Sequence, residues 1–438
     1  MNFKLPKLNF QSKEQLVSLL AVIVLTTTLP LVILAVLRAR SLSVPAETGW
    51  ETGITAIATD SGAYHYGPNI WGTKIVWTDY KGPGPEANVW LYDTLTKSKR
   101  RVTNQPYVVQ SFPDIYQNKI VWQDNRGGES NPDIYLFDLA TNTEKQLTDT
   151  VPLESPFSRY SYQAHPSIYG DKVVYTDYAS GQANTTLYDL STQATRSLTS
   201  FPRGENWPQF YPKIYKNLVV WEDRRHGKGD IYLFDLEKNK ETRITSDDLN
   251  YSIPDIWNDY IVYEGEVKGR KQVFLYNLKK KSQVQITNTS VNERLPKVWR
   301  DRIVWSGGDG TREDSVSYGI IESGGETLIR NLDIFQYNLE TGKKRRLSSH
   351  FANQLAPIPF GYKVVFTDLS AGFNQVYLFE NSCFDLNYDG LVDKKDLDLL
   401  AGHFGEQGED LIWDLNGDGK VNSADQLLIA KNKGVCTI

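Results

Sequence analysis

The stretch that decides the fold runs from Pro212 to Thr245 and reads PKIYKNLVVWEDRRHGKGDIYLFDLEKNKETRIT. Turn signals (Lys-Asn, Arg-His-Gly, Lys-Asn) separate three apolar runs and one polar–apolar segment, which predicts four strands joined by hairpin turns. The same frame, a proline followed three residues later by an aromatic residue, recurs 42 to 61 residues apart at Pro68, Pro113, Pro166, Pro212, Pro254, Pro296 and Pro357. Seven copies without a helical period predict an all-β seven-bladed propeller with four-stranded antiparallel blades.

The two ends of the repeat region complement each other. Six copies finish with a fourth strand closing in Val-Thr, Leu-Thr, Ile-Thr or Leu-Ser, but the seventh stops at Glu380 after its third strand. An orphan segment, Gly53 to Thr59, precedes the first copy, and Thr59 lies nine residues before Pro68, the spacing also found from Thr245 to Pro254. We therefore expect this N-terminal strand to complete blade seven and to close a ring over residues 53–380.

The Pro-x-aromatic start, the Ile-x-aromatic second strand, the Ile-Tyr third strand and the Leu-Thr ending resemble the TolB-type propeller repeat. The resemblance covers roughly three quarters of the chain and implies the fold, because this scaffold carries many functions. Seven copies and the absence of a Ser-Pro-Asp-Gly turn are departures from that family. A TolB-like role in envelope import remains one alternative.

The N-terminal region predicts a membrane anchor. Residues 1–14 are polar, and Leu16 to Leu37 contains 22 residues without a charge. A helix of that length spans about 33 Å, enough to cross a hydrocarbon core of about 30 Å. We expect a cytoplasmic segment at 1–14, a transmembrane helix or signal anchor at 15–38 and a linker at 39–52. A cleaved signal peptide is the alternative, although its apolar region is usually about 7 to 15 residues long.

Two stretches near the C-terminus match the twelve-residue calcium loop, in which oxygen ligands alternate with other residues and glycine makes the sharp turn at position six. The predicted ligands are Asp385, Asn387, Asp389, Leu391 (backbone carbonyl), Asp393 and Asp396 in loop one, and Asp414, Asn416, Asp418, Lys420 (backbone carbonyl), Asn422 and Asp425 in loop two, 29 residues later. Oxygen ligands at this spacing predict two Ca²⁺ ions. An amphipathic helix is expected after each loop, but none before the first.

This duplicated half EF-hand resembles a type I dockerin over residues 383–438, within a predicted domain 381–438. The resemblance implies a cohesin-like partner on another surface protein, selected in part by loop positions 10 and 11, here Lys394, Lys395, Ser423 and Ala424. It also implies neighbouring chain ends, and thus a disulfide between Cys383 and Cys436. A disulfide needs an oxidising compartment. We therefore expect the N-terminus inside the membrane and everything after residue 38 outside it, extracellular or periplasmic.

The propeller itself offers weaker functional signals. In five copies an aspartate follows the aromatic residue of strand two by two positions: Asp79, Asp124, Asp177, Asp223 and Asp368. These carboxylates either form a ring of ligands or accept backbone N–H bonds in the next turn, and we favour the second interpretation because it serves the repeat. Three long connections, 149–165, 201–211 and 306–333, should share one face, where aromatic and arginine side chains could hold a polysaccharide or a protein.

Composition limits the remaining classes of function. A net charge of −5 argues against nucleic-acid binding. The chain has no Gly-x-Ser-x-Gly, P-loop or His-Glu-x-x-His motif. His65, His165 and His350 precede inner strands, which keeps a metal-dependent polysaccharide lyase or hydrolase as an alternative. The sequence favours a non-enzymatic, membrane-anchored binding or scaffold protein with a calcium-dependent docking module.

Overall fold

The computed structural model describes residues 53–438 except 61, 83–85, 129–130, 150–162, 179–182, 200–208, 309–331, 350–351, 370–372, 381–383, 385, 387–390, 409–412, 416–418, 432 and 436–438. Residues 1–47 and 316–329 lie outside this set. Within the described residues no helix is long and apolar enough to cross a membrane. The predicted anchor at 15–38 and linker at 39–52 lie outside them.

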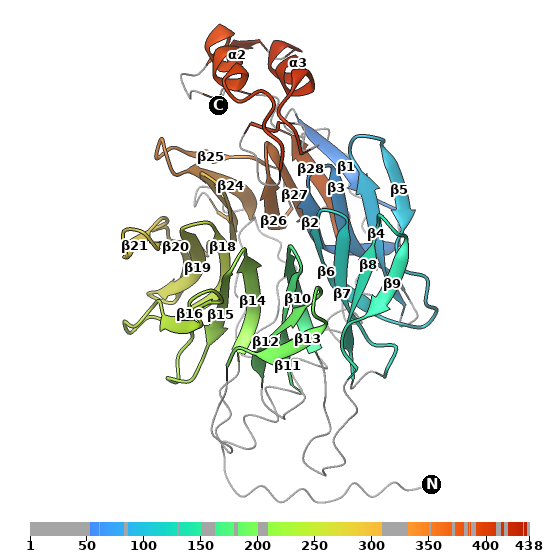
Figure 1. Cartoon of the computed structure of the whole chain (residues 1–438). Helices are drawn as coiled ribbons and strands as arrows, with labels where there is room; N and C mark the ends of the chain where they lie inside the picture. The colour runs from blue at the N-terminus through green and yellow to red at the C-terminus, as the bar shows by residue number, and fades with distance from the viewer. Residues whose placement is uncertain are drawn as a thin grey trace, which may run out of the picture. The chain divides into compact units, whose positions relative to one another are not determined.

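Seven four-stranded antiparallel sheets make up the propeller (Figure 1), as the repeat predicted. Blade one contains β2 (Ala63–Trp71), β3 (Lys74–Lys81), β4 (Ala87–Asp93) and β5 (Ser98–Arg101), and blade two contains β6 (Gln110–Tyr116), β7 (Lys119–Asp124), β8 (Asp133–Asp138) and β9 (Thr143–Gln146). Blade three contains β10 (Gln163–Tyr169), β11 (Lys172–Asp177), β12 (Asn184–Asp189) and β13 (Ala194–Ser197), and blade four contains β14 (Gln209–Tyr215), β15 (Leu218–Asp223), β16 (Asp230–Asp235) and β17 (Lys240–Arg243). Blade five contains β18 (Tyr251–Trp257), β19 (Tyr260–Val267), β20 (Arg270–Asn277) and β21 (Ser282–Gln285). Blade six contains β22 (Arg294–Trp299), β23 (Arg302–Gly307), β24 (Asp333–Asn338) and β25 (Lys344–Arg346). Blade seven contains β26 (Gln354–Phe360), β27 (Lys363–Asp368), β28 (Gln375–Glu380) and β1 (Ile54–Ala58).

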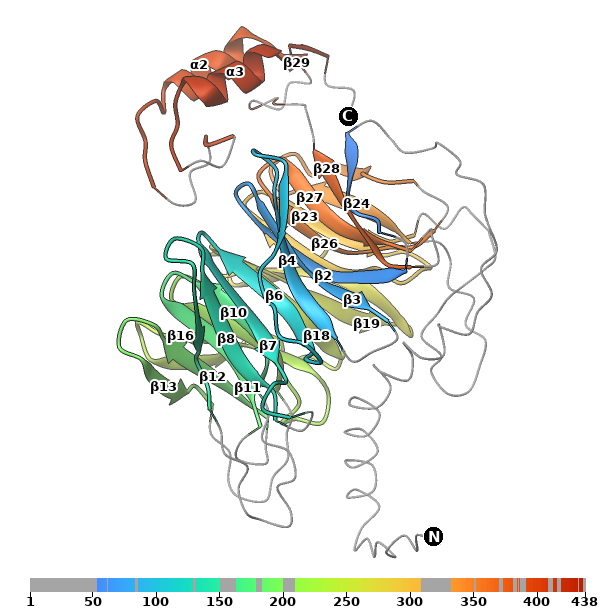
Figure 2. The same ribbon diagram turned by 90° about the vertical axis from the view of Figure 1, so that its right-hand side faces the viewer.

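The ring closes through its N-terminal strand. β1 pairs antiparallel with β28, with Ile54 opposite Phe379 and Ala58 opposite Val376. The Glu380 N–H donates to the Gly53 carbonyl at 2.8 Å, so the first and last residues of the propeller lie side by side. Figure 2 shows the same ring from another direction, with the blue first strand and the orange last blade. The predicted closure is confirmed.

The Thr or Ser that ends six of the repeats lies just beyond the fourth strand rather than within it. Its hydroxyl accepts the N–H of a residue in strand three of its own blade, at 2.8 to 3.1 Å. The residues concerned are Thr103, Thr148, Thr199, Thr245, Thr287 and Ser348. The repeat therefore ends on a side chain that satisfies a buried backbone donor, which explains why only Thr or Ser occurs there.

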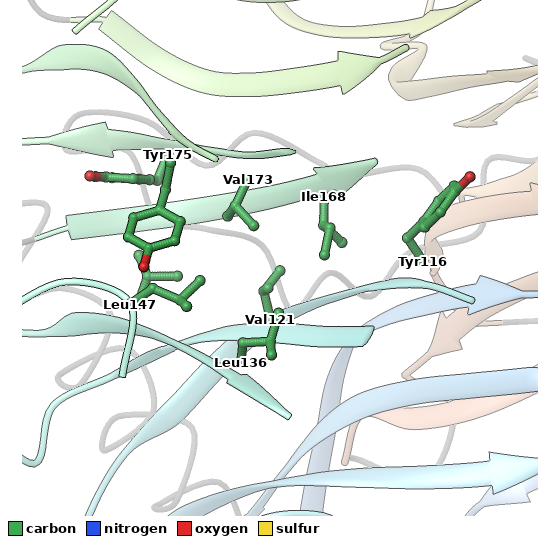
Figure 3. Packing of buried hydrophobic residues seen from close by; sticks show 9 residues of the cluster. Tyr116, Val121, Leu136, Leu147, Ile168, Val173 and Tyr175 are labelled. Atoms are coloured by element: carbon green, nitrogen blue, oxygen red, sulfur yellow. The ribbon is translucent and has the colours of Figure 1, made fainter. Parts of the chain in front are cut away.

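Apolar side chains from neighbouring blades interlock to form the core. One cluster joins Val121 and Leu136 of blade two to Ile168 and Val173 of blade three, all at most 7% exposed (Figure 3). The aromatic residue of strand two is fully buried in most blades, as Trp77, Trp122, Tyr175, Trp221, Tyr263, Trp305 and Phe366 show. Burial of large aromatic side chains between blades is a main source of stability for such a ring.

The C-terminal module has the two expected helices, α2 (Lys394–Ala401) and α3 (Ser423–Lys431). Its two short strands, β29 (Leu391–Val392) and β30 (Gly434–Val435), pair antiparallel. A small core of its own contains Val392 and Val421, and also Leu400 and Ile429, which are pairs of residues 29 positions apart. The sequence duplication is therefore a structural duplication as well.

Candidate functional site

Seven of the twelve predicted calcium ligands are described: Leu391, Asp393, Asp396, Asp414, Lys420, Asn422 and Asp425. Asp385, Asn387, Asp389, Asn416 and Asp418 lie outside the described residues, as do Cys383 and Cys436. Gly419, at position six of loop two, has φ +84°, the left-handed conformation expected for the sharp turn. Its N–H donates to the Asp414 carboxylate at 2.7 Å, which places positions one and six of the loop together.

The carboxylates at position twelve are buried in matching ways. Asp396 and Asp425 are both fully buried. One oxygen of Asp396 accepts the Leu386 N–H and the other accepts the Asp393 N–H, each at 2.7 Å. Asp425 accepts the equivalent bonds from Leu415 and Asn422 at 2.8 and 2.9 Å. Each carboxylate therefore ties position two of its loop to position nine, which brings the two halves of the loop around a common centre.

Each loop also pairs with the chain that follows the other helix. Val392, at position eight of loop one, pairs with Gly434 after α3. In loop two, the Val421 carbonyl accepts the N–H of Gly405, which follows α2, at 2.9 Å. The two pairings are related by the 29-residue offset. Because each half completes the other, the module is a single folding unit rather than two independent loops.

The predicted partner-binding residues Lys394, Lys395, Ser423 and Ala424 are all exposed, in the first turns of α2 and α3. The module also carries four of the exposed large hydrophobic residues of the described chain, namely Leu391, Leu399, Phe404 and Leu427, which are 39 to 50% exposed. Leu400 fills the core of the module, whereas Leu399 and Phe404 are exposed. Exposed apolar side chains beside polar ones are typical of a protein-binding surface.

The propeller channel is closed at one end by a ring of aromatic side chains. These are the residues three positions after each repeat proline: Trp71, Tyr116, Tyr169, Tyr215, Trp257, Trp299 and Phe360. Every ring contacts the next, with centroids 4.4 to 5.6 Å apart, all the way round the propeller. They stand at the ends of the inner strands, at the face where β28 ends.

A polar layer lies directly above this aromatic floor. Asn69 donates to Asp114 at 2.5 Å, and the Lys297 ammonium lies 3.5 Å from Asp255. Burial lowers the pKa of Lys297, and the neighbouring Asp255 partly offsets that effect. The cavity bounded by the floor and this layer measures about 110 Å³. Pockets for drug-sized ligands are typically about 300 to 1,000 Å³, so this part of the channel is too small for an oligosaccharide.

A bulge in each inner strand was not foreseen. The residue before each repeat proline has φ between +52° and +60° and interrupts the strand register: Gly67, Phe112, His165, Tyr211, Ile253, Leu295 and Ala356. His165 consequently packs between Phe112 and Tyr211, with ring centroids 4.7 and 4.8 Å apart. Burial, aided by the charge of Lys213, lowers the pKa of His165 to about 4, so the ring is neutral at pH 7. His65 lies within β2, the inner strand of blade one, opposite Asp79 of β3, and His350 is outside the described residues.

The aspartates of strand two belong to buried polar groups within the blades. In blades two and four the carboxylate accepts the turn N–H of Arg126 or Arg225 at 2.9 Å, as favoured from the sequence. It also accepts the indole N–H of Trp122 or Trp221 and a glutamine amide. That glutamine was missed, although a signal was available: Gln110, Gln163, Gln209 and Gln354 each precede the aspartate of their blade by 14 residues.

Comparison with known proteins supports the fold. No family model and no curated protein matches the chain. Among solved structures, an oligogalacturonate lyase in complex with manganese is 14% identical, with a TM-score of 0.54 over 76% of this chain and 94% of that one. The β-propeller domain of the Trilobed protease from Pyrococcus furiosus is 12% identical, with a TM-score of 0.53 over 73% and 94%. TolB from Acinetobacter baumannii is 15% identical, with a TM-score of 0.37 over 69% and 78%. The chain is thus a seven-bladed propeller with TolB-like and related propellers among its neighbours, a likeness that defines fold and not function.

Proposed function

We propose that this protein is a membrane-anchored extracytoplasmic scaffold, in which the propeller is a binding platform and the C-terminal module is a dockerin that attaches to a cohesin-like partner when calcium is bound. The observation that carries the proposal is the matched burial of Asp396 and Asp425 in two loops related by the 29-residue offset. The same bonds form a capping box at the start of α2, which accounts for the helix. A capping box alone does not account for oxygen-bearing side chains at positions one, three, five and nine of both loops.

The residues present fit two calcium ions. In each loop, side-chain oxygens at positions one, three, five, nine and twelve and the backbone carbonyl at seven would hold the ion. Bound calcium would neutralise several carboxylates gathered in a module of about 55 residues, which is small for a stable core. Calcium would therefore control whether the docking surface is folded. On the folded docking surface, four exposed residues would select the partner: Lys394, Lys395, Ser423 and Ala424.

Three further parts of the proposal follow from the same module. A disulfide between Cys383 and Cys436 would be consistent with the pairing of β30 and β29, because that pairing brings the residue before Cys436 to loop one. It would require an oxidising compartment, and the anchor at 16–37 would then hold the propeller outside the membrane. A mass measurement of the non-reduced chain, two hydrogens lighter than the reduced one, would support the disulfide.

The test is a calcium-dependent pull-down from the native cell surface with the full chain. A cohesin-like partner should be captured in calcium and released by a chelator. The double variant Lys394→Ala/Lys395→Ala should weaken capture while both calcium ions still bind, and Lys431→Ala, at the far end of α3, is the matched control. Capture that is equally strong with and without the chelator would refute calcium-dependent docking.

A carbohydrate-active enzyme is the second candidate, because an oligogalacturonate lyase is among the structures of similar fold. It would use the loop face of the propeller, with His165 of the inner strand β10 as the candidate histidine. Cleavage of acidic oligosaccharides that is lost in His165→Ala would favour this candidate over the scaffold. A TolB-like import role would instead require a periplasmic protein partner that binds the propeller without the C-terminal module.

A further inference from the structure

Blade one departs from the polar arrangement of its neighbours. Four blades place a glutamine on the inner strand, opposite the aspartate of strand two. In blade one the strand register puts His65 at that position, directly opposite Asp79. The exchange removes an amide donor and introduces a ring nitrogen that can coordinate a metal.

The His65–Asp79 pair is buried and lacks the hydrogen bonds found in other blades. The two side chains are 0% and 1% exposed. Asp124 in blade two has three side-chain donors, whereas neither ring nitrogen of His65 and neither carboxylate oxygen of Asp79 has a hydrogen-bond partner among the described residues. Buried polar atoms are rarely left unpaired, because each one costs about 1 to 3 kcal/mol.

The distance between the two groups suits a shared ligand. His65 Nδ1 lies 3.7 Å from Asp79 Oδ2, which is too long for a hydrogen bond. Two ligands of a tetrahedral metal, each about 2.1 Å from the ion, lie about 3.4 Å apart. A third donor is in place, since the ligand atoms of Asp60, His65 and Asp79 all lie within 4.8 Å of one another.

The charged groups around the site affect which metal ion can bind there. A neutral imidazole ring has one nitrogen lone pair that can bind a cation. Lys99 lies 3.1 Å from Asp60 and would have to turn away when a cation binds. Its side chain is one quarter exposed, so the ammonium can reach water.

We propose that Asp60, His65 and Asp79 bind a divalent transition-metal ion of the zinc class. One imidazole and two carboxylates are typical zinc ligands, whereas calcium and magnesium prefer oxygen alone. Asp60 lies in the link between β1, the outer strand of blade seven, and β2, the inner strand of blade one. The backbone N–H of His65 donates to the backbone carbonyl of Asn374, just before β28, at 2.9 Å. The ion would therefore fasten the closing strand to blade one, independently of the calcium loops.

The test uses the full chain in excess Ca²⁺, with Zn²⁺ alone as the probe. Bound zinc after equilibrium dialysis should approach one ion per chain. At a free concentration about 100 times the dissociation constant, the ion should raise the Tm of the propeller by about 4 °C. His65→Gln restores the residue found in four other blades, so it should fold normally and bind zinc at least about 100-fold more weakly.

Two further variants complete the experiment. Asp60→Asn, which changes the exposed ligand and leaves the buried pair in place, should also weaken zinc binding. His226→Gln alters a histidine that contacts Tyr232 in blade four and should leave zinc binding unchanged. The proposal is overturned if the wild-type protein binds no zinc, or if His65→Gln and Asp60→Asn bind it as tightly as the wild type does.

Discussion

Ring closure by the N-terminal strand can be tested with one side chain. Ile57 in β1 is only 8% exposed and packs with Trp77 of blade one and Val376 of β28. Ile57→Ala removes three carbon groups worth about 0.8 kcal/mol each on burial, or roughly 2.4 kcal/mol. The cavity left between two blades adds to that loss, so we expect the free energy of unfolding to fall by about 3 kcal/mol.

Urea unfolding followed by tryptophan fluorescence, in excess calcium, measures this change. Val284→Ala is the matched control, because Val284 also lies in an outer strand, β21, but is 53% exposed. The Val284→Ala substitution should change the free energy of unfolding by no more than about 0.5 kcal/mol. Equal shifts in the two variants would refute the reasoning, since β1 would then contribute no more than an exposed strand. Deleting residues 53–59 should be more severe and cause aggregation, because it exposes the edge of β28.

Three other predictions concern the blades. Asp223→Ala should lower the free energy of unfolding, measured in urea, by about 3 to 5 kcal/mol, because it leaves the Arg225 guanidinium and the Trp221 indole without their buried acceptor. Gly265→Ala should lower stability by about 1 to 3 kcal/mol, since its new Cβ would lie 2.5 Å from the Phe274 ring, whereas Gly82→Ala, where the nearest atom is 3.8 Å away, should be neutral. In a chelator, lowering the pH from 6.5 to about 4 should reduce the free energy of unfolding more for the wild type than for His65→Gln. The reason is that His65 takes up a proton in the unfolded chain over this pH range, whereas the buried ring of the folded protein does not. Parallel pH profiles for the two proteins would contradict that assignment.

The repeat, the blade count and the ring closure were predictable because each rests on local signals. A proline, a turn and an alternating apolar run determine a strand within a few residues, and the unfinished seventh repeat required a strand from elsewhere. The sharp turn predicted at position six of the second loop also rests on a local signal, and Gly419 adopts the positive φ that such a turn requires.

The interior of the propeller was harder to predict because its contacts join residues from different blades. The aromatic floor was visible as seven separate residues, but the closed ring of contacts depends on the radial packing of all the blades. The positive φ of Ile253, a β-branched residue, runs against local preference and is imposed by the bulge. His65 precedes Asp79 by the same 14 residues that separate each glutamine from its aspartate, but the sequence does not show that this pair is buried without hydrogen-bond partners.

Calcium stoichiometry tests the central claim most directly. Isothermal titration of the metal-free full chain should show two calcium ions bound, with a rise in the melting temperature of the C-terminal module and none in that of the propeller. Asp396→Asn and Asp425→Asn should each reduce the count to one strongly bound ion, because each removes the charge of one buried position-twelve ligand. No bound calcium, or a count that neither variant changes, would contradict the proposal of a calcium-dependent docking module.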